Sequence, residues 1–397
     1  MKLLLVADSF PPMNSSSAIQ LNDLCKELSN QKHQVHIVFP SSHIDKKMEI
    51  RSNAFYSILS ISIPDLRKSS LVKRAITELS LSLLLIFRFR QTSWSKIKFD
   101  GVIWYSPSIF FGLFAWYIKY KNNCKGYLIL RDIFPDWAVD VGLLKKNLIY
   151  YLFKFFEIFQ YKVANVIGIQ TPGNEKYFQS NAKLHNKVEV LCNWLLPISE
   201  SLPEIDIKLQ DSILFDRKIF VYAGNIGKAQ NVKSIIDIAE NLSESSEYGF
   251  LIVGRGTEKA KLQSLVESKK LHNVLFLDEI GSKYIPSLYE QCFCGIVSLN
   301  VSHQSHNIPG KFVSYMHNSL PVFAMLNPGN DLADIIETKN VGRATFKTKG
   351  DELKNELLEF SKELIINEQE IRRSCKLLAQ EMFSANSAAS QIIKALQ

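Results

Sequence analysis

Short apolar runs alternate with amphipathic stretches along the whole chain. In the first half the runs read as buried strands, because they are short, rich in Val, Ile and Leu, and bounded by polar residues. These predicted strands lie at 3–7, 34–39, 101–105, 127–130, 165–170 and 188–191. Between the first two, apolar residues recur on one face of a helix. The order strand–helix–strand predicts an α/β domain, with a parallel sheet covered by helices on both faces.

The second half repeats this pattern. Its predicted strands lie at 218–223, 249–253, 274–277, 294–299 and 320–324, with helices at 232–243, 257–270, 284–292 and 310–317. Two further helices, 351–373 and 375–396, close the chain. The segment 197–217 is polar, contains two prolines and reads as a linker. We therefore expect two Rossmann-like domains, at 1–196 and 218–378, followed by a terminal helix at 379–397.

Two doubly wound domains that face each other leave a central cleft. In open α/β sheets, ligands bind beyond the carboxyl ends of the strands. Residues that directly follow a predicted strand are therefore the first candidates for a binding or catalytic site.

Composition narrows the possible classes of protein. The chain has 397 residues, 46% of them apolar, which is ample for two cores. Its six cysteines show neither metal-ligand nor redox spacing, which suits a reducing cytosol. The start, MKLLLVADSF, turns acidic too soon for a signal peptide. The longest apolar runs, 79–87 and 109–118, fall short of the roughly 18–20 residues of a transmembrane helix, and none is expected.

The net charge of +8 is unevenly placed. Residues 1–200 carry 25 Lys and Arg against 15 Asp and Glu, whereas 201–397 carry 22 against 24. Within the basic half, segments 67–98 and 145–162 mix cations with aromatic and aliphatic residues, a pattern typical of helices that bind anionic membrane surfaces. Buried helices with solvated cations are the plainer reading, especially for 145–162. Nucleic acid is not expected as a partner, because no nucleic-acid-binding motif is present.

Three stretches of the second half follow strands and suit an anion. Gly224, Asn225 and Lys228 lie in a turn between a strand and a helix, where backbone N–H groups converge. Arg255 stands between two glycines, where an ordinary capped helix needs no long cation. Each stretch also fits an ordinary loop between a strand and a helix.

The third stretch, SHNIPGKFVSYM, places Lys311 beside a predicted helix start at Gly310. A cation there is unfavourable unless an anion binds beside it, because the helix dipole is positive at that end. His306 and Asn307 precede the helix, and Ser314 lies within it. No Asp or Glu occurs between Val301 and Pro328.

The first half offers hydroxyls and carboxylates. Ser15, Ser16 and Ser17 follow the first strand, and either cap the next helix or contact a ligand. Asp132 and Asp136 follow the strand at 127–130, where a carboxylate can accept the proton of an acceptor hydroxyl or orient it.

Several motifs together resemble the GT-B glycosyltransferases of family 4. In chain order they are SFPPMNSSSAIQLNDLCKEL, YAGNIGKAQNV, VGRG, IPSLYEQCFCGIVSL and PGKFVSYMHNSLPVFA. The order covers essentially the whole chain and is more specific than any single motif. The stretch RDIFPDW and the Pro-x-Lys helix start are similar to the branch that builds bacterial surface polysaccharides. Within that branch, the chain most resembles L-fucosamine transferases of O-antigen assembly.

The resemblance implies a GT-B fold whose last helix crosses back to the first domain. It implies a UDP-sugar donor held by the C-terminal domain, with UDP-N-acetyl-L-fucosamine as the best candidate, and retention at the anomeric carbon. The implied acceptor is an undecaprenyl-diphosphate-linked saccharide held by the N-terminal domain. No metal is implied, because lysine, arginine and helix dipoles neutralise the leaving diphosphate. Such an enzyme is cytoplasmic and peripheral on the inner face of the plasma membrane.

This sequence departs from the family pattern at several positions. Serines replace the glycines of the first loop, Asn225 and Gln230 stand where Arg and Lys are common, and His306 and Ser314 replace the two glutamates of a Glu-x7-Glu motif. The resulting hypothesis is front-face transfer without a protein nucleophile. In it Lys311 receives the diphosphate, Arg255 and Lys228 support it, His306 contacts the donor sugar, and Asp132 or Asp136 orients the acceptor. A nucleotide-sugar 2-epimerase of the same architecture and a non-catalytic sugar-binding subunit are the alternatives.

Overall fold

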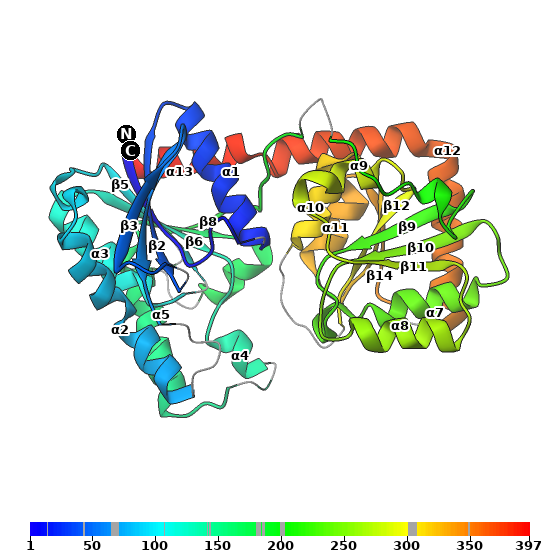
Figure 1. The fold of residues 1–397 in the computed structure, drawn as a ribbon, viewed down its shortest axis with the longest axis horizontal. Coiled ribbons are helices and arrows are strands. Elements are labelled where there is room, and N and C mark those ends of the chain that lie inside the picture. Colours follow the sequence, from blue (N-terminus) through cyan, green and yellow to red (C-terminus); the bar gives the residue numbers. More distant parts are fainter. Residues whose placement is uncertain are drawn as a thin grey trace. The chain divides into compact units, whose positions relative to one another are not determined.

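The structure is a computed structural model that describes most of the chain. The described residues are 1–13, 15–42, 44–64, 71–106, 108–140, 142, 144–179, 184, 187–198, 203–300, 308–347 and 350–397, with the backbone alone for 71–78 and 140. The chain divides into two compact units (Figure 1). Unit 1 comprises Met1–Leu196 and Ala385–Gln397, and unit 2 comprises Pro197–Ser384. The predicted site residues His306 and Asn307, the predicted linker positions 199–202 and part of segment 67–98 lie outside the described residues.

Unit 1 is built on an eight-stranded sheet in the order β3-β4-β2-β1-β5-β6-β7-β8. The strands are β1 Lys2–Val6, β2 Gln34–Ser41, β3 Met48–Ser52, β4 Tyr56–Ser62, β5 Gly101–Ser106, β6 Lys125–Leu130, β7 Val166–Ile169 and β8 Val188–Val190. All neighbours are parallel except β3 and β4. The expected sheet was wholly parallel, so this edge hairpin is a correction. Its turn forms because the Asn53 side chain accepts hydrogen bonds from the N–H groups of Phe55 and Tyr56.

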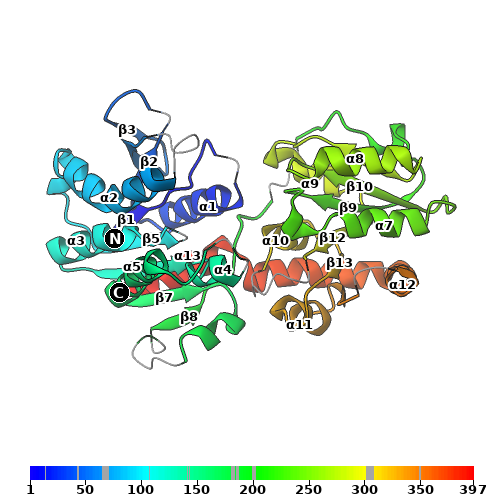
Figure 2. The same ribbon diagram turned by 90° about the horizontal axis from the view of Figure 1, so that it is seen from below.

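Helices cover both faces of the unit 1 sheet, as the sequence predicts (Figures 1 and 2). The described helices of unit 1 are α1 Ser16–Asn30, α2 Leu71–Arg90, α3 Phe111–Asn122, the short α4 Asp136–Asp140, α5 Leu148–Val163 and α13 Ala385–Leu396, and α4 lies away from the sheet. One apolar cluster joins the sheet to α2, α3 and α5. A second joins the opposite face to α1 and α13, which pack against each other.

Unit 2 is built on a six-stranded parallel sheet in the order β11-β10-β9-β12-β13-β14. The strands are β9 Lys218–Ala223, β10 Tyr248–Val253, β11 Val274–Leu277, β12 Cys294–Ser298, β13 Val322–Met325 and β14 Gly342–Thr345. The helices are α7 Lys233–Asn241, α8 Lys259–Ser268, α9 Ile285–Tyr289, α10 Gly310–His317, α11 Asp331–Thr338 and α12 Gly350–Met382. Both units are therefore Rossmann-like α/β layers.

The end of the chain differs from the prediction in its helix boundary. A break was expected near 374, with the terminal helix beginning at 379. Helix α12 instead continues to Met382, with one non-helical residue at Asn367. Its buried face extends past the expected break through Cys375, Leu378 and Ala379, which keeps the helix packed. The break falls before Ala385, whose N–H donates to Leu195 O at 3.1 Å within unit 1.

Candidate functional site

The carboxyl edge of the unit 2 sheet holds Lys311 close to the turn that follows β9. Lys311 is the second residue of α10, which begins after Pro309 and has no side-chain cap. A Cβ atom on Gly224 would stand 3.3 Å from Cε and 3.7 Å from Nζ of Lys311. Strand β9 and helix α10 thus bring two predicted residues together, although they are far apart in the sequence.

Tyr222 forms a platform under the lysine. The Lys311 Nζ donates to the Tyr222 hydroxyl at 3.1 Å and lies 4.3 Å from the ring centroid. The hydroxyl in turn donates to Asn225 O at 2.5 Å. Tyr222 is fully buried, and burial raises its pKa, so it remains a neutral donor. Sequence reasoning missed Tyr222 because it reads as one more apolar residue of β9.

Lys311 has no carboxylate partner among the described residues of unit 2. Burial lowers the pKa of Lys311 to about 8, and no acidic group opposes that effect. A half-buried ammonium without a counter-ion is costly unless an anion joins it. This geometry suits a phosphate or another oxyanion beside the first turn of α10.

The other predicted cations of unit 2 are exposed to solvent, unlike Lys311. Arg255 is exposed and forms an ion pair with Glu279, with Nε 3.1 Å from Oε2. Lys228 is exposed at the start of a short 3-10 turn, Lys228–Gln230. The Asn225 side chain donates to Gln230 at 3.1 Å. All three are exposed and remain accessible to a ligand.

Two glycines hold the loops after β9 and β10 against each other. Ile226 N–H donates to Arg255 O at 2.8 Å, and Glu258 N–H donates to Ile226 O at 3.0 Å. A Cβ atom on Gly254 would stand 2.0 Å from Gly224 O, and one on Gly256 would stand 2.2 Å from Ile226 O. The turn at Gly224 therefore takes its position from backbone contact with Gly254 and Gly256.

The position of Ser314 is peripheral to this arrangement. It lies on α10, half-buried, and its backbone carbonyl accepts from the Asn318 side chain at 2.7 Å. Burial raises the pKa of Tyr289, and a hydrogen bond with Ser314 opposes that rise. Gly310, the first residue of α10, leaves the helix start open beside Lys311.

The carboxyl edge of the unit 1 sheet holds the predicted serines, and two of them, Ser15 and Ser17, bind each other and Ser9. Ser9, Ser15 and Ser17 form a closed triangle, with Oγ–Oγ distances of 2.6, 2.7 and 3.0 Å. Ser15 also caps α1 by accepting from Ala18 N–H at 3.2 Å. Ser16 is exposed as the first residue of α1. Capping accounts for Ser15, and Ser16 is the most exposed of the three predicted serines.

Arg131 and Tyr105 lie at the same edge, beside Asp132. Arg131 is 6% exposed, donates to Leu191 O at 2.7 Å and lies 4.8 Å over the Trp194 ring. Burial raises the pKa of Tyr105 to about 12; the Arg131 charge opposes this rise, and Asp132 reinforces it. The half-buried Asp132 therefore sits near a neutral tyrosine and a buried guanidinium.

Three adjacent strands of unit 1 end in buried polar atoms that have no hydrogen-bond partner within the described part of the chain. They are Ser106 Oγ at the end of β5, Nε and Nη2 of Arg131 after β6, and Thr171 Oγ1 after β7. Unpaired buried groups of this kind are rare and mark places for water or a ligand. The sequence signal for them was their position directly after strands.

Asp136, the second predicted carboxylate, is held in a network. Its oxygens accept from the Tyr150 hydroxyl at 2.7 Å and from Lys154 Nζ at 2.6 Å. Lys154 also pairs with the fully buried Glu157 at 2.5 Å. Although burial opposes the effect, hydrogen bonds from Lys154 and Tyr150 hold the pKa of Asp136 below its ordinary value. Both oxygens of Asp136 are therefore engaged within this network.

Asp136→Asn is therefore expected to lower the stability of the fold rather than the rate of the reaction. We expect the free energy of unfolding to fall by about 1–3 kcal/mol at neutral pH, because a charge-assisted pair is lost. The folded pKa is depressed, so this contribution is present above the ordinary value of 3.8 and is lost as pH falls through the lower folded pKa. Urea unfolding of both proteins across that range measures the difference, and turnover should change less than threefold. A difference in unfolding free energy that persists at the acid end would contradict this account.

The described residues hold no cluster of three or more His, Cys, Asp or Glu side chains that suits a metal ion. The buried thiols are also unsuited to chemistry. Burial raises the pKa values of Cys25, Cys292, Cys294 and Cys375 above their ordinary range.

Part of the chain matches a known family. Residues 206–376, most of unit 2, match the family described as "Glycosyl transferases group 1". "Probable glycosyltransferase WbjE" of Pseudomonas aeruginosa is 23% identical over 241 residues, which span 57% of each chain. "Putative colanic acid biosynthesis glycosyl transferase WcaI" of Escherichia coli K12 is 20% identical over 334 residues, which span 80% of this chain and 81% of that one.

Solved structures share the fold over nearly the full chain. Sucrose-phosphate synthase of Thermosynechococcus elongatus is 14% identical with a TM-score of 0.73, covering 99% of this chain and 97% of that one. WaaG, a glycosyltransferase of lipopolysaccharide biosynthesis, is 14% identical with a TM-score of 0.68, covering 100% and 99%. Anabaena HepE, solved with UDP and glucose, is 15% identical with a TM-score of 0.66, with the same coverage. The fold is thus GT-B, as expected from the sequence.

Proposed function

We propose that this protein is a glycosyltransferase that moves a sugar from a nucleotide-sugar donor to a saccharide acceptor during bacterial surface polysaccharide assembly. The observation that carries the proposal is Lys311, which lies on Tyr222 at the carboxyl edge of the unit 2 sheet and has no carboxylate partner among the described residues of that unit. It lies within the segment that matches the glycosyl transferases group 1 family. The likeness of the chain to WbjE supports a glycosyltransferase, and its likeness to WcaI, named for colanic acid biosynthesis, supports a role in polysaccharide assembly.

In this proposal unit 2 binds the donor through its diphosphate. Lys311 neutralises the charge that develops on the leaving group, and the first N–H groups of α10 and the turn at Gly224 add hydrogen bonds. Arg255 and Lys228 are exposed cations available to the same diphosphate. His306 and Asn307 are proposed to contact the donor sugar. Ser314 is proposed to replace a glutamate at the nucleotide ribose with a shorter contact.

Unit 1 is proposed to bind the acceptor near Asp132. The acceptor hydroxyl attacks the anomeric carbon on the face from which the diphosphate departs. The bond from carbon to phosphate oxygen breaks, the new glycosidic bond forms, and the hydroxyl proton passes to the departing phosphate oxygen. Configuration is retained, and no protein nucleophile is needed. Asp132 orients the hydroxyl, and no metal enters the reaction.

The best candidate donor is UDP-N-acetyl-L-fucosamine, and the best candidate acceptor is an undecaprenyl-diphosphate-linked saccharide. The test is a panel of UDP-sugars, including UDP-N-acetyl-L-fucosamine, each incubated with undecaprenyl-diphosphate-linked GlcNAc. We expect UDP release that depends on the acceptor, and a product with a retained anomeric configuration by NMR. A changed nucleotide sugar without acceptor would identify an epimerase instead. UDP binding without turnover on any acceptor would favour a non-catalytic subunit.

A further inference from the structure

Unit 1 exposes an unusual number of large apolar side chains on one layer of helices. Helix α3 packs against both α2 and α5, so the three helices form a continuous layer on one face of the sheet (Figure 1). We call the outer side of this layer the apolar face. Its exposed apolar and aromatic residues are Leu83, Phe87, Trp116, Tyr120, Leu148, Ile149, Tyr151, Leu152, Phe155 and Ile158. Contiguous exposed apolar surface of this kind marks an interaction site.

Helix α5 exposes large apolar side chains to solvent in addition to those that it buries. Its solvent side carries Leu148, Tyr151 and Phe155, which are 87%, 61% and 62% exposed. Its buried side carries members of the apolar cluster and also two polar residues, Glu157 and Gln160, both 0% exposed. A helix of a water-soluble domain turns its apolar stripe inward, because exposed apolar area forfeits about 25 cal/mol per Å². The outward apolar side of α5 therefore needs a non-aqueous partner.

Polar contacts on the inner side of α5 help to fix the helix to the rest of unit 1. Lys154 pairs with Asp136 of α4 at 2.6 Å and with Glu157 at 2.5 Å. Tyr177, after β7, donates to Glu157 at 2.8 Å. These polar contacts anchor the helix to the domain, and they leave its apolar side free for another surface.

Helix α3 extends the same face with aromatic rings. Trp116 and Tyr120 stack, with ring centroids 5.8 Å apart and an interplanar angle of 17°. They are 47% and 80% exposed. Tryptophan and tyrosine are the residues that favour the headgroup level of a bilayer, because each combines an apolar ring with a polar group.

Every exposed charge on the described side chains of α2, α3 and α5, and of the turn before α5, is positive. These cations are Arg90, Lys121, Lys145, Lys146 and Lys162, and the one acid of α5, Glu157, is buried. An anionic surface complements such a face, whereas a face for another protein normally mixes both signs at its rim. A second copy of this chain would bring cations against cations.

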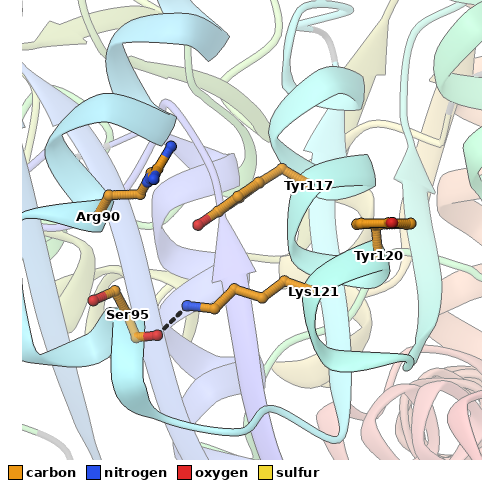
Figure 3. A pocket seen from close by; sticks show the side chains of 5 residues that line it. All are labelled: Arg90, Ser95, Tyr117, Tyr120 and Lys121. Carbon is orange, nitrogen blue, oxygen red and sulfur yellow. Dashed lines mark hydrogen bonds between the residues drawn. The ribbon is translucent and has the colours of Figure 1, made fainter.

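A pocket at the edge of the face adds a place for an anionic headgroup. It has a volume of about 400 Å³ and lies between the end of α2, the short 3-10 helix Ser93–Lys96 and α3. Arg90, Ser95, Tyr117, Tyr120 and Lys121 line it. Lys121 donates to Ser95 O, and Figure 3 shows the Tyr117 hydroxyl pointing toward the space between Arg90 and Lys121.

We infer that the apolar face docks unit 1 on an anionic phospholipid bilayer, with the aromatic rings at headgroup depth and the cations on lipid phosphates. None of the described helices combines the length and the apolar character that would let it cross a bilayer, so the attachment is to the surface. The inference refines the sequence-based membrane segments: it adds α3, which they omit. It stands independently of the proposed transfer reaction, because it rests on the surface of unit 1 alone.

The experiment is vesicle co-sedimentation of the full chain, without any sugar nucleotide. We expect binding to vesicles of phosphatidylglycerol mixed with phosphatidylcholine, little binding to phosphatidylcholine alone, and weaker binding as salt rises. Leu148→Asp with Phe155→Asp should lower partitioning at least tenfold. Lys145→Glu with Lys146→Glu should lower it severalfold on the anionic vesicles only.

Matched controls come from unit 2. Ile366→Asp changes a side chain that is 80% exposed on α12, and Lys376→Glu reverses an exposed cation there. Both should leave partitioning unchanged, and thermal melting confirms that each variant folds. Equal binding of all variants would overturn the inference. A stable dimer by light scattering that Leu148→Asp and Phe155→Asp dissociate, without vesicle binding, would assign the face to a second copy and would also overturn it.

Discussion

Lys311→Met should lower turnover by roughly 100- to 1000-fold while leaving unit 2 folded. The side chain lies against Tyr222 and the turn at Gly224, with no carboxylate among the described residues to neutralise it. Methionine keeps most of the apolar length and removes the charge, so the Tyr222 platform remains packed. Steady-state kinetics with the best UDP-sugar of the panel measures the loss, and thermal melting checks the fold.

Other cations of unit 2 provide the comparison. Arg255→Met should cost less than tenfold, because Arg255 is exposed and already paired with Glu279. Lys233→Met removes an exposed lysine that pairs with Asp237 on its own helix, and it should have no effect. A Lys311→Met enzyme within threefold of wild type would show that the diphosphate leaves elsewhere. Equal losses of turnover for Lys311→Met and Arg255→Met would indicate that the positive charge of the whole region acts on the diphosphate, rather than Lys311 in particular.

The pH dependence follows from the same lysine. Its pKa in the free protein is lowered to about 8, so the ammonium is present below pH 8 and is lost as pH rises through that value. UDP affinity should therefore fall above pH 8, and binding should draw a proton from solution, because an anion stabilises the charged form. Lys311→Arg keeps its charge across this range and should abolish the decline. Calorimetric titration with UDP in buffers of different ionisation enthalpy measures both effects.

Elements with sharp boundaries in the sequence were predicted well. Strand β9 and helix α10 match the predicted ranges 218–223 and 310–317 in full. The strand is an apolar run between polar residues, and the helix starts after a proline, so local chemistry sets both ends. Strand β3 was missed because it is short, mostly exposed and rich in polar residues, and only its pairing with β4 makes it a strand.

The candidate site was predictable in part. Lys311 and Gly224 were chosen from separate loops, but the sequence had no means of joining them, because their contact depends on the tertiary packing of α10 beside β9. The network around Asp136 could not be predicted for the same reason, because Lys154 and Tyr177 belong to other segments of the chain. On α3 apolar residues surround the whole helix, so periodicity did not separate the exposed Trp116 from buried Phe114.

The last prediction concerns the turn at Gly224, whose position depends on its close contact with Gly254. Gly254→Ala should destabilise unit 2 by roughly 3–5 kcal/mol, because the new Cβ would lie 2.0 Å from Gly224 O and the φ of +143° is one that L-residues rarely adopt. The turn must move to relieve the clash, and with it the contact to Lys311. Urea unfolding measures the stability, and UDP titration of the folded protein at low temperature measures the site.

Substitutions at two other glycines serve as controls. They distinguish the effects of the steric clash and of the backbone conformation from an effect on the binding site. Gly342→Ala creates an equal clash, 1.9 Å from Val322 O, at the start of β14, so it should lower stability comparably yet leave UDP affinity intact in the folded fraction. Gly329→Ala meets nothing within 4 Å at a φ of +77°, so it should cost only about 1–2 kcal/mol of backbone strain. If Gly254→Ala weakens UDP binding no more than Gly342→Ala does, the turn after β9 does not shape the phosphate site. If instead Gly254→Ala alone loses affinity, the close approach of the two loops sets the geometry in which Lys311 meets its anion.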